Sequence, residues 1–558
     1  MGLDKFEKAR IADEVLRDYH VIDKSPHYFQ CLTRHAQSTP DTAAIIYYGR
    51  EITYRELEDL SNRFAGALRG AGVKKGDRVG LFMQNCPQFW ICFFGAQKMG
   101  AVSVFLNPMN KGQELEYYIN SVQLDTIVAE NECYPVIEDI TDRLRLRNIF
   151  VTTPSDFLPE IPTIPLFPGM DRPKKNYEGT HDLIDTLQAY PPHPIELETD
   201  VRNDPLFIVF TAGTTGLPKG IVHTHYNLNY HACVKRVALR YYLENSATLV
   251  VLPLFHLASF QYWNPAFYRG SSIVLLYRWD AASGIEAISK YHVTIAQLPV
   301  TQYEEMMNLP NFKKYNLSAF EIPISVSFGK TLTKEISEKW EQVTGHRLNE
   351  GGYGMSETLS HDATNFFERK IPPILGKPTP GTEFRIVDID SGEILPRGKE
   401  GRVLIRTPSL FKEYWNDPEQ TGKSISQGGW FDTGDIGKID EEGYFYFLGR
   451  LKEMIKVSGW SVFPEEVESL IKRHPAVKQV AVIGVSDPKR GEIPKGFIVL
   501  NEEFKGKITE KVMIEWCRDN ISAYKYPRRI EFRDSLPAHS SGKLRRLDLK
   551  KEEEAKKI

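Results

Sequence analysis

The amino-acid sequence predicts an α/β protein. It should have a large N-terminal domain of layered α/β subdomains, with a β-barrel-like part, and a small mobile α+β C-terminal domain. Strand-like apolar runs alternate with helical segments between Arg78 and Leu106, and the alternation resumes at Leu206, which is typical of helices layered on a mainly parallel sheet. Phe384–Val387 and Arg402–Arg406 indicate β-structure bounded by glycine turns. The pattern changes after Phe447, where helices and strands form a module of ordinary domain size.

Length and charge narrow the class of protein. A chain of 558 residues corresponds to about three to four domains, or to fewer large ones. The hydrophobic fraction of 41% supports a substantial core, and the net charge of −3 gives no sign of a nucleic-acid binder or a polybasic membrane protein. We therefore expect small-molecule substrates and no nucleic-acid partner. A homodimer is one expectation for the assembly.

The cysteines and apolar runs indicate the cellular compartment. No Cys-x-x-Cys pair occurs, which argues against a zinc site or a disulfide framework and fits a reducing cytosol. The N-terminal segment is charged and lacks the apolar stretch of a secretory signal. The longest apolar stretch, Thr248 to Phe260, is too short to span a bilayer. We expect a soluble cytoplasmic enzyme with no transmembrane segment.

The first third of the chain gives clear local signals. Residues 1 to about 40 have a polar helical pattern, and Ala43–Tyr48 with Glu51–Tyr54 predicts a hairpin around Gly49 and Arg50. Thr53 is the expected N-cap of the next helix, with Glu56 at its third position. Alternation then predicts strands at Arg78–Met83 and Ala101–Leu106, and a helix at Gln88–Met99.

The remaining elements follow the same periodicities. Residues 153 to 195 hold nine prolines and are interpreted as a surface excursion. Strand candidates follow at Val250–Leu257, Ile273–Tyr277, Thr294–Leu298 and Ile322–Val326. In the C-terminal module we expect helices at Glu465–Arg473 and Glu510–Asn520, and strands at Val480–Val485 and Gly496–Leu500.

A loop rich in glycine, threonine and lysine follows the buried strand Pro205–Phe210. Its sequence is Thr211-Ala212-Gly213-Thr214-Thr215-Gly216-Leu217-Pro218-Lys219-Gly220. Glycines let backbone N–H groups turn toward an anion, threonine hydroxyls add donors, and lysine adds charge. The P-loop pattern fails because Pro218 precedes Lys219 and Gly220 follows it, and no dinucleotide fingerprint is present. A plain flexible turn is the alternative to a phosphate site.

Two further motifs carry carboxylates beside glycines and aromatic residues. In Gly351-Gly352-Tyr353-Gly354-Met355-Ser356-Glu357, the tyrosine could stack on a flat ligand and the glutamate could hold Mg²⁺. In Trp430-Phe431-Asp432-Thr433-Gly434-Asp435, a carboxylate on a turn could accept both hydroxyls of a ribose. Each has an ordinary alternative, a common glycine turn and an Asx-turn closing a hairpin. Arg450 could clamp a ribose or phosphate, although a lone arginine more often forms a surface ion pair.

A lysine or a histidine outside a motif does not by itself indicate a functional site. Lys543, in Pro537-Ala538-His539-Ser540-Ser541-Gly542-Lys543, lies on a turn from which a lysine can neutralise a phosphoryl-type transition state. Taken alone, a solvated lysine is the better interpretation. His256 lies in an apolar run, where a histidine is more often a core residue than a ligand. His223 and His225 lack a completing ligand set, so we expect no metal there.

Taken in order, these motifs resemble those of the adenylate-forming enzymes, which include acyl-CoA synthetases, luciferases and nonribosomal adenylation domains. The similarity runs from about residue 27 to 549. The TAGTTGLPKG loop is similar to the family's phosphate loop, YGMSE to its Y-G-x-T-E motif, and FDTGD to its T-G-D motif. GRLKEMIKVSG is similar to its hinge and PAHSSGK to its catalytic-lysine motif.

The resemblance assigns a role to each matching residue. It implies catalytic roles for Lys543, Glu357 and Thr211, Mg²⁺ binding by Glu357, and a hinge at Lys452. It implies ATP binding by Thr211, Ala212, Gly213, Thr214, Thr215, Gly216, Lys219, Gly329, Lys330, Gly352, Tyr353, Gly354, Met355, Ser356, Asp435, Arg450 and Lys543. The implied acyl pocket contains His256, Ser259, Phe260, Trp263 and Phe328, and the implied CoA path contains Ser458, Gly459 and Trp460.

The implied reaction is an AMP-forming acid–CoA ligation that uses ATP, Mg²⁺ and CoA. An acyl-adenylate forms first, the small domain rotates, and CoA thiolate then expels AMP. The implied domains are 1–448, a hinge at 449–453, and 454–558. A fatty, medium-chain or related acid is the expected substrate. Phe328 and Lys330 replace small residues of the family pattern, and the bulk of Phe260, Tyr262, Trp263 and Phe328 near the expected pocket favours short, medium or aromatic acids over very long chains. The alternatives are an adenylating enzyme with a carrier-protein acceptor and a non-catalytic acyl or nucleotide sensor.

Overall fold

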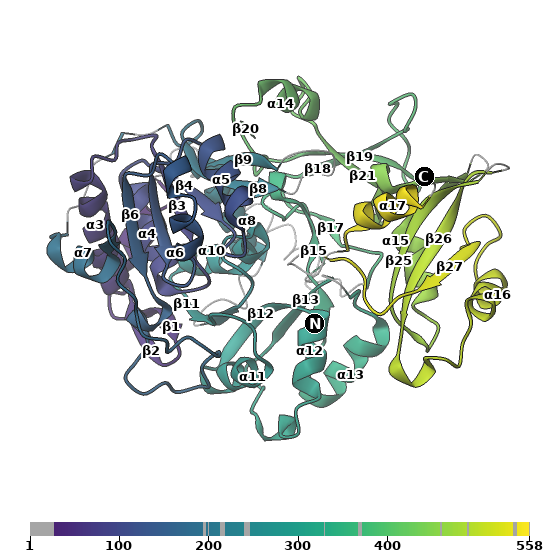
Figure 1. Cartoon of the computed structure of the whole chain (residues 1–558), viewed down its shortest axis with the longest axis horizontal. Coiled ribbons are helices and arrows are strands. Elements are labelled where there is room, and N and C mark those ends of the chain that lie inside the picture. Colours follow the sequence, from purple (N-terminus) through teal and green to yellow (C-terminus); the bar gives the residue numbers. More distant parts are fainter. Residues whose placement is uncertain are drawn as a thin grey trace.

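The computed structural model describes residues 27–192, 197–198, 200–211, 218–238, 246–327, 330–365, 371–457, 460–487, 490–538 and 544–556. Within them, two large mixed sheets and two small antiparallel sheets form the N-terminal part, and a fifth sheet forms the C-terminal part. Figure 1 shows the C-terminal part, in yellow-green, lying beside the green antiparallel strands. The helical pattern expected for residues 1–26 lies outside the described residues.

The first large sheet has the strand order β14-β13-β12-β10-β11-β1-β2, and only the β1–β2 pair is antiparallel. The predicted hairpin is confirmed, and Thr53 caps the following helix by accepting a hydrogen bond from the backbone N of Glu56 at 3.1 Å. Its strands are β1 (Ala43–Tyr47), β2 (Arg50–Thr53), β10 (Ala247–Val250), β11 (Ser272–Leu275), β12 (Val293–Pro299), β13 (Ile322–Val326) and β14 (Asn349–Glu350).

The second large sheet has the order β20-β9-β8-β4-β3-β5-β6-β7. β9 is antiparallel to both of its neighbours, and the other pairs are parallel. Its strands are β3 (Arg78–Phe82), β4 (Val102–Leu106), β5 (Thr126–Glu130), β6 (Asn148–Thr152), β7 (His181–Asp182), β8 (Pro205–Thr211), β9 (Lys219–Thr224) and β20 (Glu413–Tyr414). β8 and β9, the strands on either side of the predicted phosphate loop, are antiparallel partners.

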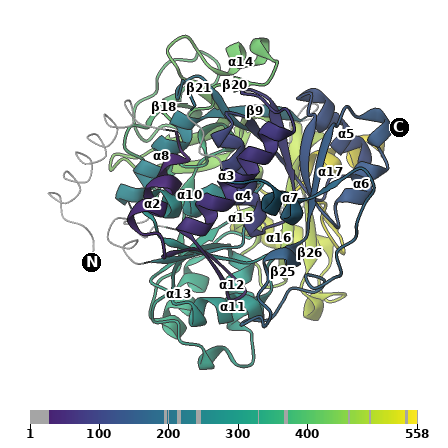
Figure 2. The same ribbon diagram turned by 90° about the vertical axis from the view of Figure 1, so that its left-hand side faces the viewer.

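Helices cover the two sheets and fill the space between them. Figure 2 shows α3, α4, α8 and α10 gathered in one region of the molecule. The helices of the N-terminal part are α2 (Gln30–Ser38), α3 (Tyr54–Gly70), α4 (Pro87–Lys98), α5 (Gly112–Ser121), α6 (Tyr134–Glu138), α7 (Leu183–Ala189), α8 (His225–Ala238), α10 (Phe260–Arg269), α11 (Ala281–Lys290), α12 (Val300–Met307), α13 (Lys334–Thr344) and α14 (Pro418–Ser424). No helix in this described part of the chain is both long and apolar enough to cross a bilayer.

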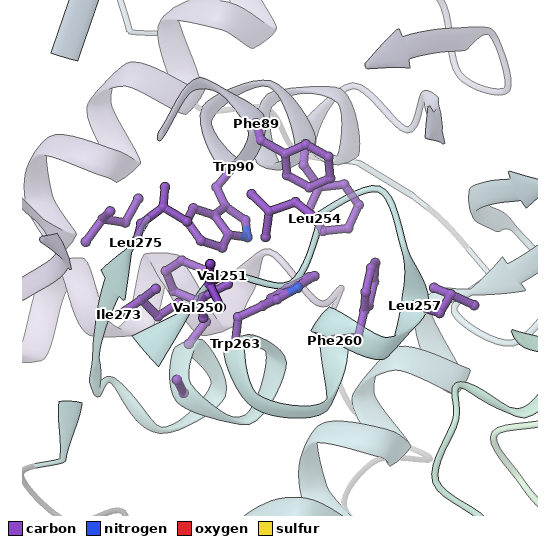
Figure 3. Packing of buried hydrophobic residues seen from close by; sticks show 14 of the residues in the cluster. Phe89, Trp90, Val250, Val251, Leu254, Leu257, Phe260, Trp263, Ile273 and Leu275 are labelled. Carbon is purple, nitrogen blue, oxygen red and sulfur yellow. The ribbon is translucent and has the colours of Figure 1, made fainter. Parts of the chain in front are cut away.

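The main core lies where α4 and α10 pack between the two sheets. Every residue of α4 is buried, as expected of a helix that is apolar all round. Its Trp90 ring lies 6.0 Å from the Trp263 ring of α10, and Phe93 lies 6.3 Å from Phe207 of β8. Figure 3 shows Trp90 and Trp263 close to Val250 of β10 and to Ile273 and Leu275 of β11. Burying several aromatic rings in edge-to-face contact stabilises the junction between the sheets.

Two antiparallel sheets follow. One has the order β15-β16-β17 and the other β18-β19-β21-β22. The β-barrel-like part expected from the sequence is therefore a pair of open sheets in the described structure, and neither closes into a barrel. Their strands are β15 (Gly352–Tyr353), β16 (Ala363–Thr364), β17 (Lys377–Pro378), β18 (Glu383–Val387), β19 (Gly401–Arg406), β21 (Phe431–Ile439) and β22 (Phe445–Arg450).

The C-terminal part is the predicted small α+β module. Its sheet has the order β24-β23-β26-β25, with β27 parallel to β26. The predicted helix Glu510–Asn520 is confirmed as α16, while both predicted strands extend further than the apolar runs. The elements are β23 (Ile455–Val457), β24 (Trp460–Val462), α15 (Pro464–Ile471), β25 (Val477–Asp487), β26 (Gly491–Leu500), α16 (Glu510–Asn520), β27 (Arg529–Phe532) and α17 (Arg546–Ala555).

Three local predictions were wrong. The strand expected at Val250–Leu257 ends at Val250, because the apolar run continues through a buried turn. The surface excursion at 153–195 contains β7 and α7, which pack on β6 and α3. The FDTGD segment was expected on a turn but lies within β21, where Gly434 adopts a φ of 68°. That conformation suits glycine and introduces an irregularity without ending the strand.

Candidate active site

The first part of the site lies where β8 passes into β9. Thr211 and Lys219 are partners across this antiparallel pair, so the two ends of the predicted phosphate loop meet. Residues 212–217 lie outside the described residues. The Lys219 amine lies 5.1 Å from the centre of the Tyr414 ring, within the range of a cation–π contact. Tyr414 reaches this place because β20 pairs with β9.

Glu357 lies beside the same tyrosine. It belongs to a short 3₁₀ turn, Ser356–Thr358, and its carboxylate accepts a hydrogen bond from the Tyr414 hydroxyl at 3.1 Å. Its backbone carbonyl accepts a bond from the Phe411 N–H at 2.7 Å, which fixes the turn. Burial raises the pKa of the Glu357 carboxyl. A nearby cation would oppose that shift, so the position suits a carboxylate that binds a metal ion.

The glycines of this segment are required by close backbone approach. A Cβ on Gly352 would lie 2.1 Å from the Ala363 carbonyl oxygen, and Gly352 also has a φ of 136°. A Cβ on Gly354 would lie 2.1 Å from the Ser360 carbonyl carbon. Any larger residue would force the segment apart, since real Cβ atoms do not approach backbone so closely. Glycine here lets the chain fold back so that Glu357 faces Tyr414.

A second set of contacts joins Tyr353, Asp435 and Arg450. β21 pairs with β22 so that Asp435 and Arg450 are directly opposite. The Arg450 Nε lies 2.9 Å from Asp435 Oδ1, and the Tyr353 hydroxyl donates a hydrogen bond to Asp435 Oδ2. Arg450 Nη1 also donates to the Thr433 carbonyl at 3.1 Å. The Asp435 carboxylate is buried and held from both sides, so its position is fixed within the folded chain.

The Tyr353 ring is itself enclosed by aromatic side chains. Its centroid lies 4.6 Å from that of Phe445, 6.0 Å from Phe447 and 6.2 Å from Phe384. The side chain is therefore held by packing at the ring and by hydrogen bonding at the hydroxyl. Stacking of this ring on adenine stays a prediction.

His223 connects the phosphate loop's strand to the turn that carries Glu357. Its ring Nε2 lies 2.8 Å from the Ser356 carbonyl oxygen, and the side chain is fully buried in β9. Burial lowers the pKa of His223 to about 4, so the ring is neutral near pH 7 and Nε2 donates to the carbonyl. In the described part of the chain, no three His, Cys, Asp or Glu side chains gather as a metal site.

Comparison with known proteins identifies the family. The family model described as "AMP-binding enzyme" matches residues 32–415, and "AMP-binding enzyme C-terminal domain" matches 466–543. The chain belongs to the AMP-binding enzyme family. It is an acyl-CoA synthetase of the AMP-forming class, with ATP and CoA as the family's co-substrates and Mg²⁺ as its metal ion.

Relatives and solved structures cover nearly the whole chain. A long-chain-fatty-acid–CoA ligase of Bacillus subtilis is 32% identical, with 94% of each chain covered. A crotonobetaine/carnitine–CoA ligase of Salmonella agona is 32% identical, with 90% of this chain and 93% of the relative covered. The anthranilate CoA ligase AuaEII, solved with anthranoyl-AMP, has a TM-score of 0.82 at 29% identity, with 95% and 98% covered. The relatives therefore share the fold and differ in the acid that their names state.

Of the residues predicted for the acyl pocket, His256 and Ser259 belong to a short turn, whereas Phe260 and Trp263 lie in the hydrophobic core. His256 Nδ1 accepts a hydrogen bond from the Ala258 N–H at 3.1 Å and so caps the short turn Leu257–Ser259. The Ser259 hydroxyl donates to the His256 carbonyl at 2.9 Å and accepts from Trp263 Nε1 at 3.2 Å. Phe260 and Trp263 are 0% exposed and belong to the core in Figure 3. Phe328 lies outside the described residues.

Other predicted site residues are distributed between the two parts of the molecule. Lys330 pairs with Glu304 of α12 at 2.6 Å. Lys452 is exposed, in the middle of a 3₁₀ turn, Leu451–Glu453, directly after β22. Trp460 begins β24, and its backbone pairs with Val457. Outside the described residues lie Ala212, Gly213, Thr214, Thr215, Gly216, Gly329, Ser458, Gly459 and Lys543.

Two residues of the site were missed by sequence reasoning. Tyr414 links Lys219 to Glu357, yet it lies in a short segment with no motif around it. Arg546, three residues after Lys543, binds Glu453 of the turn after β22 at 2.6 Å, and Glu465 and Glu468 of α15 at 3.0 and 2.8 Å. The proximity of Arg546 to Lys543 was the signal that could have drawn attention to it. This network ties the segment after Lys543 to the expected hinge.

Proposed function

We propose that this chain activates a short, medium-chain or aromatic carboxylic acid as its adenylate and transfers the acyl group to CoA. The observation that carries the proposal is the joining of distant motifs by direct contacts. Lys219, Tyr414 and Glu357 form one set, and Tyr353, Asp435 and Arg450 form the other. The first set offers charge and a carboxylate for phosphates and Mg²⁺, and the second offers a fixed carboxylate and guanidinium for a ribose.

In this proposal, different residues bind different parts of ATP. In this proposal Lys219 and the loop from Thr211 hold phosphate oxygens, and Asp435 with Arg450 holds the ribose. Glu357 would hold Mg²⁺, which neutralises charge on the phosphates when it is bound. Tyr414 orients the Glu357 carboxylate through its hydroxyl. Lys543 would then approach the acid's carboxylate and the α-phosphate, where two anions must meet.

The second half-reaction needs a different set of residues in the same place. We assign residues 1–448 to the large domain, 449–453 to the hinge and 454–558 to the small domain. Two observations support a boundary here: β22, which pairs with β21 of the large domain, ends at Arg450 inside the proposed hinge, and the two family matches end at 415 and begin at 466. Rotation about Lys452 would remove Lys543 and bring Ser458, Gly459 and Trp460 to the thiol path.

The preference for a smaller acid is supported by the tight packing of the hydrophobic core behind His256. Phe260 and Trp263 are fully enclosed among aromatic side chains of α4 and β8. A long alkyl chain would have to displace these rings, whose packing stabilises the junction between the sheets. A short, medium-chain or aromatic acid would not. The relatives named above, which act on fatty acids, carnitine derivatives and anthranilate, leave the choice among acids open.

The test is pyrophosphate release with ATP, Mg²⁺ and a panel of acids, with and without CoA. The proposal predicts acid-dependent pyrophosphate release, and AMP and a CoA thioester when CoA is added. Pyrophosphate release without any thioester would favour a carrier-protein acceptor. No release with any acid would contradict the proposal and favour a non-catalytic sensor.

A further inference from the structure

Glu357 lies in a loop that connects two short antiparallel strands. β15 pairs with β16, and residues 354–362, here named the Glu357 loop, run between them. Within this loop Leu359 and Ser360 have φ angles of 57° and 59°, in the left-handed region that residues other than glycine rarely adopt. Such a conformation persists where the surrounding structure holds it. The contacts that hold this loop therefore also determine where the Glu357 carboxylate lies.

Gln261 of α10 holds the left-handed part of the Glu357 loop. Its side-chain Nε2 donates to the Leu359 carbonyl at 3.0 Å and also donates to the Ser360 carbonyl. Gln261 is 4% exposed and Leu359 is 0% exposed, so water has little access to replace the amide at these carbonyls. A buried carbonyl without a donor is costly, so the backbone at both residues depends on this one side chain.

Asp362 closes the Glu357 loop at its base. Its backbone N–H donates to the Tyr353 carbonyl at 2.9 Å, and its carboxyl Oδ2 accepts a hydrogen bond from the Thr358 hydroxyl. Thr358 directly follows Glu357, and both Thr358 and Asp362 are 0% exposed. Burial raises the pKa of the Asp362 carboxyl, which favours the neutral acid as the acceptor of this bond. Asp362 thus joins the two ends of the loop to the residue beside Glu357.

Two further segments bind the backbone next to Glu357. The His223 ring of β9 donates to the Ser356 carbonyl at 2.8 Å, and the Phe411 N–H donates to the Glu357 carbonyl at 2.7 Å. Together with Gln261, these groups bind backbone carbonyls on both sides of Glu357 and at Glu357 itself. They come from elements far apart in the sequence. The backbone that carries the carboxylate is therefore fixed by the fold itself.

We infer that Gln261 and Asp362 are positioning residues for Glu357, which fix the Glu357 loop so that its carboxylate meets the Mg²⁺ of bound MgATP. This inference rests on the proposed function, in which Glu357 holds Mg²⁺. Each residue acts through the backbone that carries Glu357 and not through contact with the nucleotide. Asp435 and Arg450 hold the ribose in that proposal. Loss of either positioning contact should therefore weaken Mg²⁺-dependent binding and spare binding of the nucleoside part.

The experiment measures nucleotide binding by isothermal titration calorimetry, without turnover. The probes are AMP and α,β-methylene-ATP, which cannot be cleaved between its α- and β-phosphates, and the second probe is titrated with and without Mg²⁺. In the unchanged protein Mg²⁺ should tighten binding of α,β-methylene-ATP. Gln261→Met conserves volume and removes the donor. It should reduce that Mg²⁺-dependent gain about 3- to 10-fold, the effect of one hydrogen bond, and change the affinity for AMP by less than about twofold.

Three other variants separate positioning from folding. Asn264→Leu is the matched control for Gln261→Met, because Asn264 lies on the same helix and its buried amide donates to the Leu228 carbonyl at 3.1 Å. It should leave the Mg²⁺-dependent gain unchanged. Thr358→Val removes the donor to Asp362 with little change of shape and should reduce the gain several-fold. Asp362→Asn keeps an oxygen that accepts from Thr358 and should retain most of the gain.

The outcomes distinguish this inference from the proposed function. A Mg²⁺-dependent gain that Gln261→Met and Thr358→Val leave unchanged would overturn the positioning roles and leave the ligase proposal intact. The same holds if these variants weaken AMP binding as much as they reduce the gain, or if Asn264→Leu reduces the gain equally. A gain lost in Asp362→Asn as fully as in Thr358→Val would overturn the role of Asp362. No gain from Mg²⁺ in the unchanged protein would overturn the proposed role of Glu357 together with this inference.

Discussion

Replacing Arg546 should destabilise the C-terminal domain and uncouple it from the hinge. The Arg546 side chain is 11% exposed and contacts Glu453, Glu465 and Glu468, whose side chains are 28%, 28% and 6% exposed. In Arg546→Met three carboxylates would surround an apolar side chain. Removing one partner from a buried ionic network costs about 3–5 kcal/mol. Because water reaches two of the glutamates, we expect about 3 kcal/mol, the lower end of that range.

The assay is urea unfolding combined with hydrogen exchange of peptides from β25 and α17, since a protein of two domains need not unfold in one step. The matched control is Lys423→Met, which removes an exposed i,i+4 pair with Glu419 and should change stability by less than about 0.5 kcal/mol. Arg546→Met should also reduce adenylation more than thioester formation from supplied acyl-adenylate, because Arg546 supports the Lys543 segment. Equal small effects of the two variants on unfolding would refute this reasoning.

Two further predictions follow from the site, and a third from the buried carboxyl group of Glu350 at the end of β14. Lys543→Ala should cripple adenylation and largely spare thioester formation from supplied acyl-adenylate, whereas Gly459→Leu should do the reverse; equal loss in both half-reactions of either variant would contradict the domain rotation. Tyr414→Phe should raise the KM for MgATP several-fold by releasing the Glu357 carboxylate, and an unchanged KM at limiting Mg²⁺ would contradict that role. Burial raises the pKa of Glu350 to about 7, so the native state retains a proton that the unfolded chain releases. The free energy of unfolding should therefore fall between about pH 4.5 and 7, by about 2–3 kcal/mol for this group, and Glu350→Gln should remove that part of the slope in urea unfolding.

The sequence predicted the bounds of a helix or strand correctly where its structure depends on the residues of that segment itself. β13 and α16 have the predicted bounds, and Thr53 caps α3 as its spacing with Glu56 indicated. The prediction at Val250–Leu257 failed because Asn85, far away in the chain, completes the backbone hydrogen bonds of a buried turn. Its amide donates to the carbonyls of Val251 and Leu252 at 3.1 and 3.2 Å. An apolar run alone does not distinguish such a turn from a strand.

In the candidate site, too, the residues that belong to local motifs were predicted, and a residue positioned by long-range strand pairing was not. The motifs around Lys219, Glu357 and Asp435 were recognisable because their residue types match a known order. Tyr414 was not, since its role arises from the pairing of β20 with β9, which brings together segments far apart in sequence. Residues whose function comes from long-range packing leave little trace in local sequence.

The central claim is that an acid's carboxylate attacks the α-phosphate of ATP. The most direct measurement uses an accepted acid labelled with heavy oxygen in its carboxylate, followed by mass spectrometry of the nucleotide product after CoA is added. The bond from the acid oxygen to phosphorus persists when CoA displaces the nucleotide at the acyl carbon. We therefore predict one labelled oxygen in the phosphate of AMP. Label in inorganic phosphate together with ADP, or unlabelled AMP beside a formed thioester, would contradict the account.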